Sequence, residues 1–334
     1  MTNIPICSFT SPHTHTQTLD CPSDFDYAFM LSFIQPRMIV GVESVVDNVY
    51  ARSFRFVADS STHHDTDTTD SGCDNSSNNV IDNSGDNNSR QMHTGRIQVA
   101  YLTKSNQLEV TIVCNHPAAV EPVLKRIRFM FDLDTDMSEI ESKLKHDQVL
   151  QRGFVNGHVP RMPKAFDSFE FCVRAILGQQ VSVKAATTLA GRVAHAADLQ
   201  TPASFPRELD CFFPQLTDVI DLSFEGLGLT KTRIGTLITV IQALQGQLIS
   251  LNKDQVFEDY LQQWTALKGV GPWTANYLAM RGLGIQDSFP DKDLGVLKAL
   301  AVEGDYPSRK VVLQQAEAWQ PYRAYATLCL WNGL

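Results

Sequence analysis

The residues with the clearest chemical character lie between positions 267 and 293. The stretch LKGVGPW, Leu267–Trp273, places Gly269 and Gly271 on either side of one valine. Glycine permits positive φ and has no side chain, so the chain can turn tightly and expose its backbone amides. Pro272 suits the first turn of a helix, whose amides and dipole favour an anion such as phosphate. The spacing is equally compatible with an ordinary short connection between two helices.

A carboxylate follows this turn at a fixed distance. Asp293 lies 22 residues beyond Gly271, after the loop RGLGIQDSFPDK. A preorganised carboxylate can stabilise positive charge that develops during a reaction, whereas a plain N-cap is the structural alternative for an aspartate at a helix start. Lys292 either lowers the pKa of Asp293 by its charge or faces solvent.

The second half of the chain supplies helices to position these groups. From about residue 161 onward, apolar residues recur at spacings of three and four, which predicts helix after helix, with a break near Gly178 to Ser182. No repeat of 20 to 50 residues is evident. We therefore expect a mainly helical domain over residues 126–334, with the two helices around the glycine turn at about 260–281.

The first half of the chain has a different pattern of apolar residues. Alternating runs at Arg52–Ala58, Arg96–Thr103 and Leu108–Cys114 predict a small antiparallel sheet. Helical spacing at 26–38 and 118–133 completes an α+β domain over residues 22–125. The polar stretch 59–95 has too little apolar surface to offset ordering and is interpreted as a disordered insertion. Residues 1–21 are interpreted as a disordered tail.

Composition narrows the function classes. The 28 Lys and Arg against 37 Asp and Glu argue against a nonspecific polyanion binder held by bulk charge. Residues 161–334 are nearly balanced, with about 16 basic and 17 acidic residues, so this half can still present a positive face. The chain has no run of 18 apolar residues and no signal-peptide pattern at its start, so we expect a cytoplasmic protein without membrane association. Seven cysteines without C-x-x-C spacing indicate neither a disulfide framework nor an iron–sulfur or zinc site. His63, His64, Asp65 and Asp67 are better explained by solvated polar sequence than by metal binding.

Several motifs in order resemble one family. MLSFI at 30–34, SFEFCVRAILGQQVSV at 168–183, GVGPWTANYLAMRG at 269–282, FPDKDL at 289–294 and WQPYRAYATLCLW at 319–331 are similar to the helix-hairpin-helix DNA glycosylases. The resemblance is greatest to the bacterial DNA-3-methyladenine glycosylase II family, which acts on alkylated bases, and covers about residues 24–331. It implies a mainly helical glycosylase domain preceded by a small α+β domain.

The resemblance also implies roles for individual residues. Asp293 is the expected catalytic carboxylate. The expected base pocket consists of aromatic residues, namely Phe33, Trp273, Tyr277 and Trp331. The expected DNA contacts are Gln179, Gln180, Gly269, Val270, Gly271 and Thr274. The backbone carbonyls of Thr265, Leu267 and Val270 are a possible site for a structural Na⁺ or K⁺; no cofactor is required.

Gln180, Trp273 and Arg323 need separate comment in the light of this resemblance. Gln180 occupies the position of an intercalating side chain that is usually leucine; alternatively, Gln179 and Gln180 cap a helix break. Trp273 stands where strand-nicking relatives carry a lysine, and an indole cannot form a Schiff base with the sugar. Arg323 either approaches a phosphate or pairs with an acid.

We therefore expect a monofunctional glycosylase of base excision repair that removes alkylated purines from double-stranded DNA. We expect it to be monomeric, and nucleoid-associated while on DNA. The alternatives are a glycosylase for oxidised or deaminated bases and a helix-hairpin-helix protein that binds DNA without catalysis.

Overall fold

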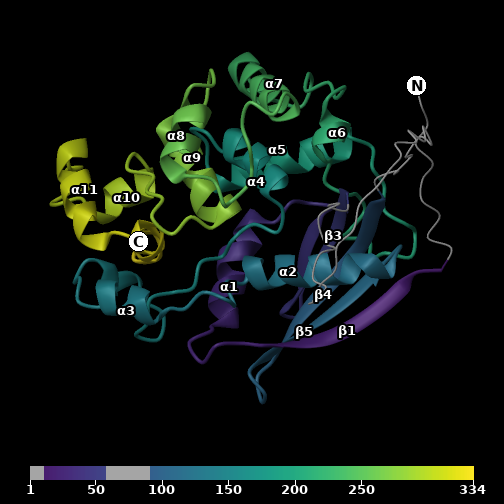
Figure 1. Ribbon diagram of the computed structural model, residues 1–334, viewed down its shortest axis with the longest axis horizontal. Helices are drawn as coiled ribbons and strands as arrows, with labels where there is room; N and C mark the ends of the chain where they lie inside the picture. The colour runs from purple at the N-terminus through teal and green to yellow at the C-terminus, as the bar shows by residue number, and fades with distance from the viewer. Residues whose placement is uncertain (1–10, 58–90) are drawn as a thin grey trace, which may run out of the picture.

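The computed structural model describes residues 11–57 and 91–334 (Figure 1). An antiparallel five-stranded sheet of order β1-β5-β4-β3-β2 forms the N-terminal part. Apolar residues alternate along its central strands, so that one face carries Ile97, Val99, Leu108, Val110 and Ile112, all fully buried. This face packs against the first two helices. The bounds are β1 His13–Asp20, β2 Glu43–Val46, β3 Val49–Val57, β4 Met92–Leu102, β5 Gln107–Cys114, α1 Tyr27–Ile34 and α2 Val120–Met130.

The remainder of the chain is helical, which confirms the predicted α+β class with a mainly helical second part (Figure 1). The predicted break is also present, because α4 ends at Leu177 and α5 begins at Val183. Two large cores, one around α4 and the other around α12, hold these helices together. The bounds are α3 Ser138–Leu144, α4 Ser168–Leu177, α5 Val183–Ala196, α6 Leu216–Val219, α7 Lys231–Gln245, α8 Phe257–Thr265, α9 Pro272–Leu278, α10 Leu294–Ala299, α11 Arg309–Ala316 and α12 Arg323–Asn332.

Strand β1 corrects the prediction that residues 1–21 form a disordered tail. His13–Asp20 pairs with β5 along its whole length. Leu19 is the one buried residue of this strand, so the backbone ladder, more than apolar burial, holds it in place. Polar residues on both faces of an edge strand leave little hydrophobic pattern to read. Residues 1–10 lie outside the described part of the chain.

The predicted insertion 59–95 also needs correction at its end. Strand β4 begins at Met92, so residues 92–95 belong to the sheet. Gly95 permits this because its backbone packs against Phe54 and the carbonyl of Val113, where a Cβ would collide. The rest of the predicted insertion, apart from residue 91, lies outside the described residues.

The expected domain boundary at 125/126 falls inside helix α2. Val123, Leu124, Ile127 and Met130 lie on one side of this helix and are buried in the same core as the sheet. Because this apolar face is continuous, the helix cannot be divided between two units. Within the described residues no helix is long and apolar enough to cross a lipid bilayer.

Candidate active site

The glycine turn joins helices α8 and α9. Gly269 has φ +89°, and a Cβ there would lie 1.9 Å from Oγ1 of Thr236 on α7, so only glycine fits. Val270 is buried in the core and its amide donates to the carbonyl of Leu267 at 3.1 Å. Gly271 differs from the expectation of positive φ: it is extended at φ −93°, and a Cβ there would meet no atom within 4 Å. Gly271 therefore leaves the outer side of the turn open.

Asp293 is both the N-cap of α10 and a member of the cleft. Its Oδ1 accepts the amide of Gly295 at 2.8 Å and that of Val296 at 3.2 Å. The same oxygen accepts the indole N–H of Trp331 at 2.8 Å, while Oδ2 accepts that of Trp273 at 2.8 Å. Hydrogen bonds of this kind are strong and fix the orientation of the carboxylate. The capping and catalytic interpretations of Asp293 are thus compatible.

Aromatic rings form the walls beside this carboxylate. Trp273 and Tyr277 stack at 5.2 Å between ring centroids, and Tyr277 meets Trp331 edge to face at 6.0 Å. These three residues and Asp293 line a cleft of about 350 Å³, which is in the range of small-molecule sites. Phe33 does not line this cleft; it stacks on Trp331 at 6.5 Å and is 9% exposed. Phe33 therefore supports the pocket wall from the N-terminal part.

The residues that line the cleft but were not singled out from the sequence include Phe171, Arg37 and Arg174. Arg174 approaches Glu43 at 3.4 Å and Glu170 at 3.9 Å, so carboxylates offset its charge. Burial lowers the pKa of Arg37 to about 10, which leaves it protonated at neutral pH. Neither arginine lies near Asp293 in sequence, so no local pattern could have assigned them to the same cleft.

The hydroxyl group of Tyr277 contacts a buried arginine. Its hydroxyl oxygen accepts a hydrogen bond from Arg281 Nη1 at 3.1 Å. Burial would raise the pKa of Tyr277, but the charges of Arg281 and Arg37 outweigh burial, and the pKa is lowered. The π-helical turn Ala279–Leu283 places Arg281 one turn after Tyr277, within reach of the Tyr277 hydroxyl.

The two glutamines have different environments. Gln179 donates from Nε2 to the carbonyl of Gly269 at 3.0 Å and to Oγ1 of Thr274 at 2.9 Å. Gln180 is exposed, has φ +55°, and its side chain makes no hydrogen bond within the described residues. Both line a second, open cleft of about 1040 Å³ that runs from Gly269 and Gly271 to Asp293.

Arg323 and Lys292 also have defined environments. Arg323 forms a bidentate pair with Asp287, with both N–O distances at 2.7 Å, so it pairs with an acid. Lys292 lies at the open cleft and is exposed, whereas the described hydrogen-bond donors to Asp293 are indoles and amides. This arrangement agrees with a solvent-facing lysine.

The chain is similar in sequence and in fold to known DNA glycosylases. A family profile described as the AlkA N-terminal domain matches residues 16–167. Over 321 residues the chain is 30% identical to DNA-3-methyladenine glycosylase 2 of Escherichia coli (strain K12), covering 94% of this chain and 96% of that protein. A solved structure, a 3-methyladenine DNA-glycosylase from Archaeoglobus fulgidus, matches with a TM-score of 0.67 at 17% identity, over 94% of this chain and 97% of that one. This last likeness concerns the fold.

A further relative is longer than this chain. The probable bifunctional transcriptional activator/DNA repair enzyme AlkA of Mycobacterium tuberculosis (strain CDC 1551 / Oshkosh) is 37% identical over 211 residues. That match covers 63% of this chain and 42% of the relative, so the chain spans less than half of that protein.

Proposed function

The chain belongs to the DNA-3-methyladenine glycosylase 2 family, and from this premise we propose that it hydrolyses the N-glycosidic bond of alkylated purines in duplex DNA. The observation that carries the proposal is the carboxylate of Asp293. It is oriented by Trp273 and Trp331 at 2.8 Å each, beside an aromatic cleft and an open glycine turn.

The reacting nucleotide must leave the duplex. A glycosidic bond inside stacked DNA is inaccessible, and extrusion costs a few kcal/mol. The amides around Gly271 and the first turn of α9 lie at the open cleft and suit a backbone phosphate, a contact that positions DNA without reading sequence. Gln180 lines the same cleft, and we expect its side chain to occupy the space that the extruded nucleotide leaves.

The carboxylate of Asp293 then stabilises the positive charge that develops during cleavage. A purine alkylated at N3 or N7 is cationic and leaves readily, so cleavage depends on stabilising positive charge that moves onto the sugar. Asp293 supplies that stabilisation without reorganisation, because its hydrogen bonds already fix it. The faces of Trp273 and Tyr277 attract the cationic base by about 0.5–2 kcal/mol each. Water completes the hydrolysis.

We propose that the enzyme is monofunctional and monomeric. Trp273 offers no nucleophilic amine, so a covalent Schiff base with the sugar cannot form there.

The carbonyls of Thr265, Leu267 and Val270 lie at the C-terminal end of α8 and in the turn, where helix carbonyls lack intrahelical partners. Such oxygen donors suit Na⁺ or K⁺, which would brace the turn against DNA.

Single-turnover release of methylpurines from methylated duplex DNA tests the proposal. Asp293→Asn should reduce release by roughly 100-fold or more, as removal of a transition-state electrostatic contact does, while affinity for undamaged duplex stays within about twofold. Asparagine is also a good N-cap, so folding is retained. The matched control is Asp26→Asn, which changes another capping aspartate, at α1.

Each alternative predicts a different result. Binding without release by the unmutated protein would favour a DNA-binding module. Release from duplexes carrying oxidised or deaminated bases, but not methylated ones, would favour the other glycosylase class. Strand nicking, or trapping of a covalent complex by borohydride, would contradict monofunctional chemistry.

A further inference from the structure

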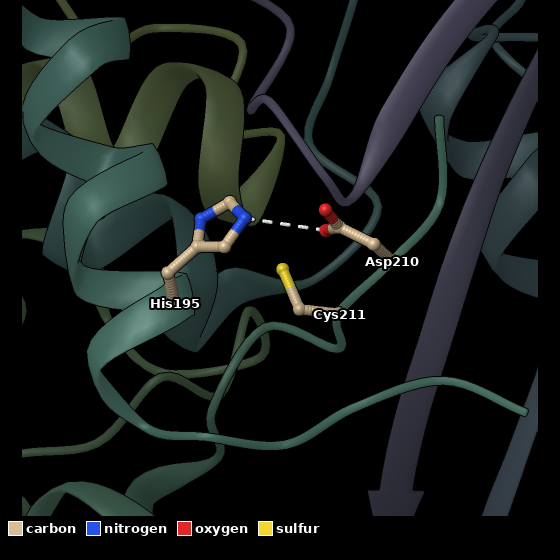
Figure 2. A group of neighbouring side chains, drawn as sticks. All are labelled: His195, Asp210 and Cys211. Atoms are coloured by element: carbon tan, nitrogen blue, oxygen red, sulfur yellow. Dashed lines mark ion pairs between the residues drawn. The ribbon is translucent and has the colours of Figure 1, made fainter. Parts of the chain in front are cut away.

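A cluster of three potential metal ligands lies outside the proposed active site. His195, near the end of α5, and the consecutive residues Asp210 and Cys211 turn their side chains toward one another (Figure 2). One donor atom from each residue lies within 4.8 Å of the others, and His195 Nε2 is 3.2 Å from Asp210 Oδ1. Tetrahedral zinc with bonds of about 2.0–2.3 Å separates its ligand atoms by roughly 3.3–3.6 Å. The His195–Asp210 separation is close to this value, and the remaining donor separations are at most 4.8 Å.

The hydrogen bonding of His195 orients its second nitrogen toward the cluster. Nδ1 lies 2.7 Å from the carbonyl oxygen of Gly191. A carbonyl only accepts, so Nδ1 carries a proton, and in the neutral ring Nε2 presents a lone pair to Asp210. A lone pair facing a carboxylate requires a cation, either a second ring proton or a metal ion. The bond to Gly191 is also the type of outer contact that fixes metal-binding histidines.

The protein backbone holds the cluster in place. The Cys211 amide donates to the carbonyl of Gly41 at 3.1 Å, and its carbonyl accepts from Ser53 at 2.7 Å. A Cβ on Gly41 would lie 2.4 Å from Asp210 Oδ1, 2.9 Å from Cys211 Sγ and 2.9 Å from His195 Cε1. Gly41 therefore lies directly against all three side chains, and its lack of a side chain lets them converge.

We propose that His195, Asp210 and Cys211 bind a divalent metal ion of the zinc class. Nitrogen, oxygen and sulfur donors together suit zinc, whereas magnesium and calcium prefer oxygen alone. The side chains of His195 and Asp210 are 47% and 57% exposed, so water can complete the coordination. On binding, the Cys211 thiol loses its proton to solvent and the sulfur takes the metal.

The position of the cluster gives the metal a structural role. It joins the C-terminal end of α5 to the Asp210–Cys211 segment beside the Gly41 turn of the N-terminal part. The N-cap of α5, Ser182, lines the open cleft at the opposite end of the same helix. The sequence offered no sign of this site, because the ligands lack the usual spacing and meet only in the fold.

Cobalt(II) is the probe, because its thiolate complexes absorb in the near ultraviolet. The full chain, kept reduced, is titrated with Co²⁺ and then with Zn²⁺. We expect one equivalent of Co²⁺ to give a thiolate charge-transfer band that Zn²⁺ abolishes. Cys211→Ser should eliminate the band, and His195→Gln or Asp210→Asn should weaken cobalt binding at least tenfold. Cys21→Ser and Asp198→Asn are the matched controls and should leave the band unchanged.

Absence of the band, or its persistence in folded Cys211→Ser, would overturn the proposal and leave His195 and Asp210 as an ion pair. If circular dichroism shows that Cys211→Ser does not fold, the variants of the two exposed ligands, His195 and Asp210, provide the test. Unchanged cobalt affinity in both His195→Gln and Asp210→Asn would then overturn the site. Methylpurine release is not used as a readout, so failure here leaves the proposed glycosylase activity untouched.

Discussion

Trp331 and Asp293 lie 38 residues apart in sequence, yet the indole N–H of Trp331 donates to a carboxylate oxygen of Asp293 at 2.8 Å. Trp273 makes the equivalent bond to the second oxygen. The carboxylate plane is therefore fixed by two tryptophans, one from the helix after the glycine turn and one from the last helix. The rings that form the pocket wall also orient the charge that the pocket needs.

Trp331→Phe separates these two roles, because phenylalanine retains an aromatic face and loses the N–H. A hydrogen bond to a charged group contributes about 1.5–3 kcal/mol, so we expect methylpurine release to slow by roughly 10- to 100-fold. Affinity for undamaged duplex should not change. Single-turnover kinetics and fluorescence anisotropy provide the two measurements.

Trp319→Phe is the matched control for this substitution. Trp319 also donates its indole N–H to an aspartate, Asp147, at 2.7 Å, but it is buried in the core and does not line the cleft. Its loss should lower the free energy of unfolding and leave the rate of the folded enzyme unchanged. Equal slowing by both substitutions would show that the Trp331 bond acts through stability alone.

The two glycines of the turn should respond differently to alanine. Gly269→Ala combines positive φ with a collision against Thr236; we expect a loss of unfolding free energy above the roughly 1–3 kcal/mol of backbone strain. Gly271→Ala meets no neighbour and should change stability by less than about 0.5 kcal/mol. Its methyl group points into the open side of the turn and should weaken DNA binding. Urea unfolding and anisotropy distinguish the effects, and wild-type DNA affinity in Gly271→Ala would contradict a phosphate contact there.

The architecture was largely predictable because burial leaves a periodic pattern. Alternation predicted the central strands β3 to β5, and spacings of three and four predicted the helices. Strand β1 was not predictable, because His13–Asp20 gains its place from backbone pairing to β5 and buries only Leu19. The boundary at 125/126 was wrong because α2 shows one helical pattern that no local composition change interrupts.

The candidate site was predictable where its residues share one segment. The turn and Asp293 stand close in sequence, and their motif was apparent. Arg37 was not, because only the packing of the N-terminal part on the helices brings it to the cleft. The inward orientation of Gln179 likewise depends on the turn contacts of a segment some 90 residues away.

The neighbouring glutamines provide a second matched pair. Gln179→Ala removes both bonds to the turn, each contributing about 1 kcal/mol, and should lower stability and DNA affinity together. Gln180→Gly keeps the positive φ without strain and should preserve stability while slowing base extrusion severalfold. Gln180→Leu should match or exceed wild type, because an apolar side chain fills a base stack better. Fluorescence of 2-aminopurine beside the lesion reports extrusion, and an unchanged signal in Gln180→Gly would exclude an intercalating role.

His93 makes stability depend on pH. This histidine of β4 is 2% exposed, lies 5.4 Å from the Phe56 ring and 5.9 Å from that of His116. Its Nδ1 has no hydrogen-bond partner among the described residues. Burial, and then the charge of His116, lower the pKa of His93 from its usual 6.5. Below pH 6.5 the unfolded chain therefore binds a proton that the folded chain excludes.

The free energy of unfolding should accordingly fall as pH drops from 7 toward 5, since stability rises with pH wherever the unfolded state holds more protons. His93→Phe removes this group, and we expect the slope to become shallower by at most about 1.4 kcal/mol per pH unit, the limit for one proton. Urea unfolding at pH 7, 6 and 5 measures the slope. His158→Gln, at an exposed histidine beside Glu141, is the control and should change the slope less. Identical slopes in His93→Phe and wild type would show that His93 takes up its proton equally in both states.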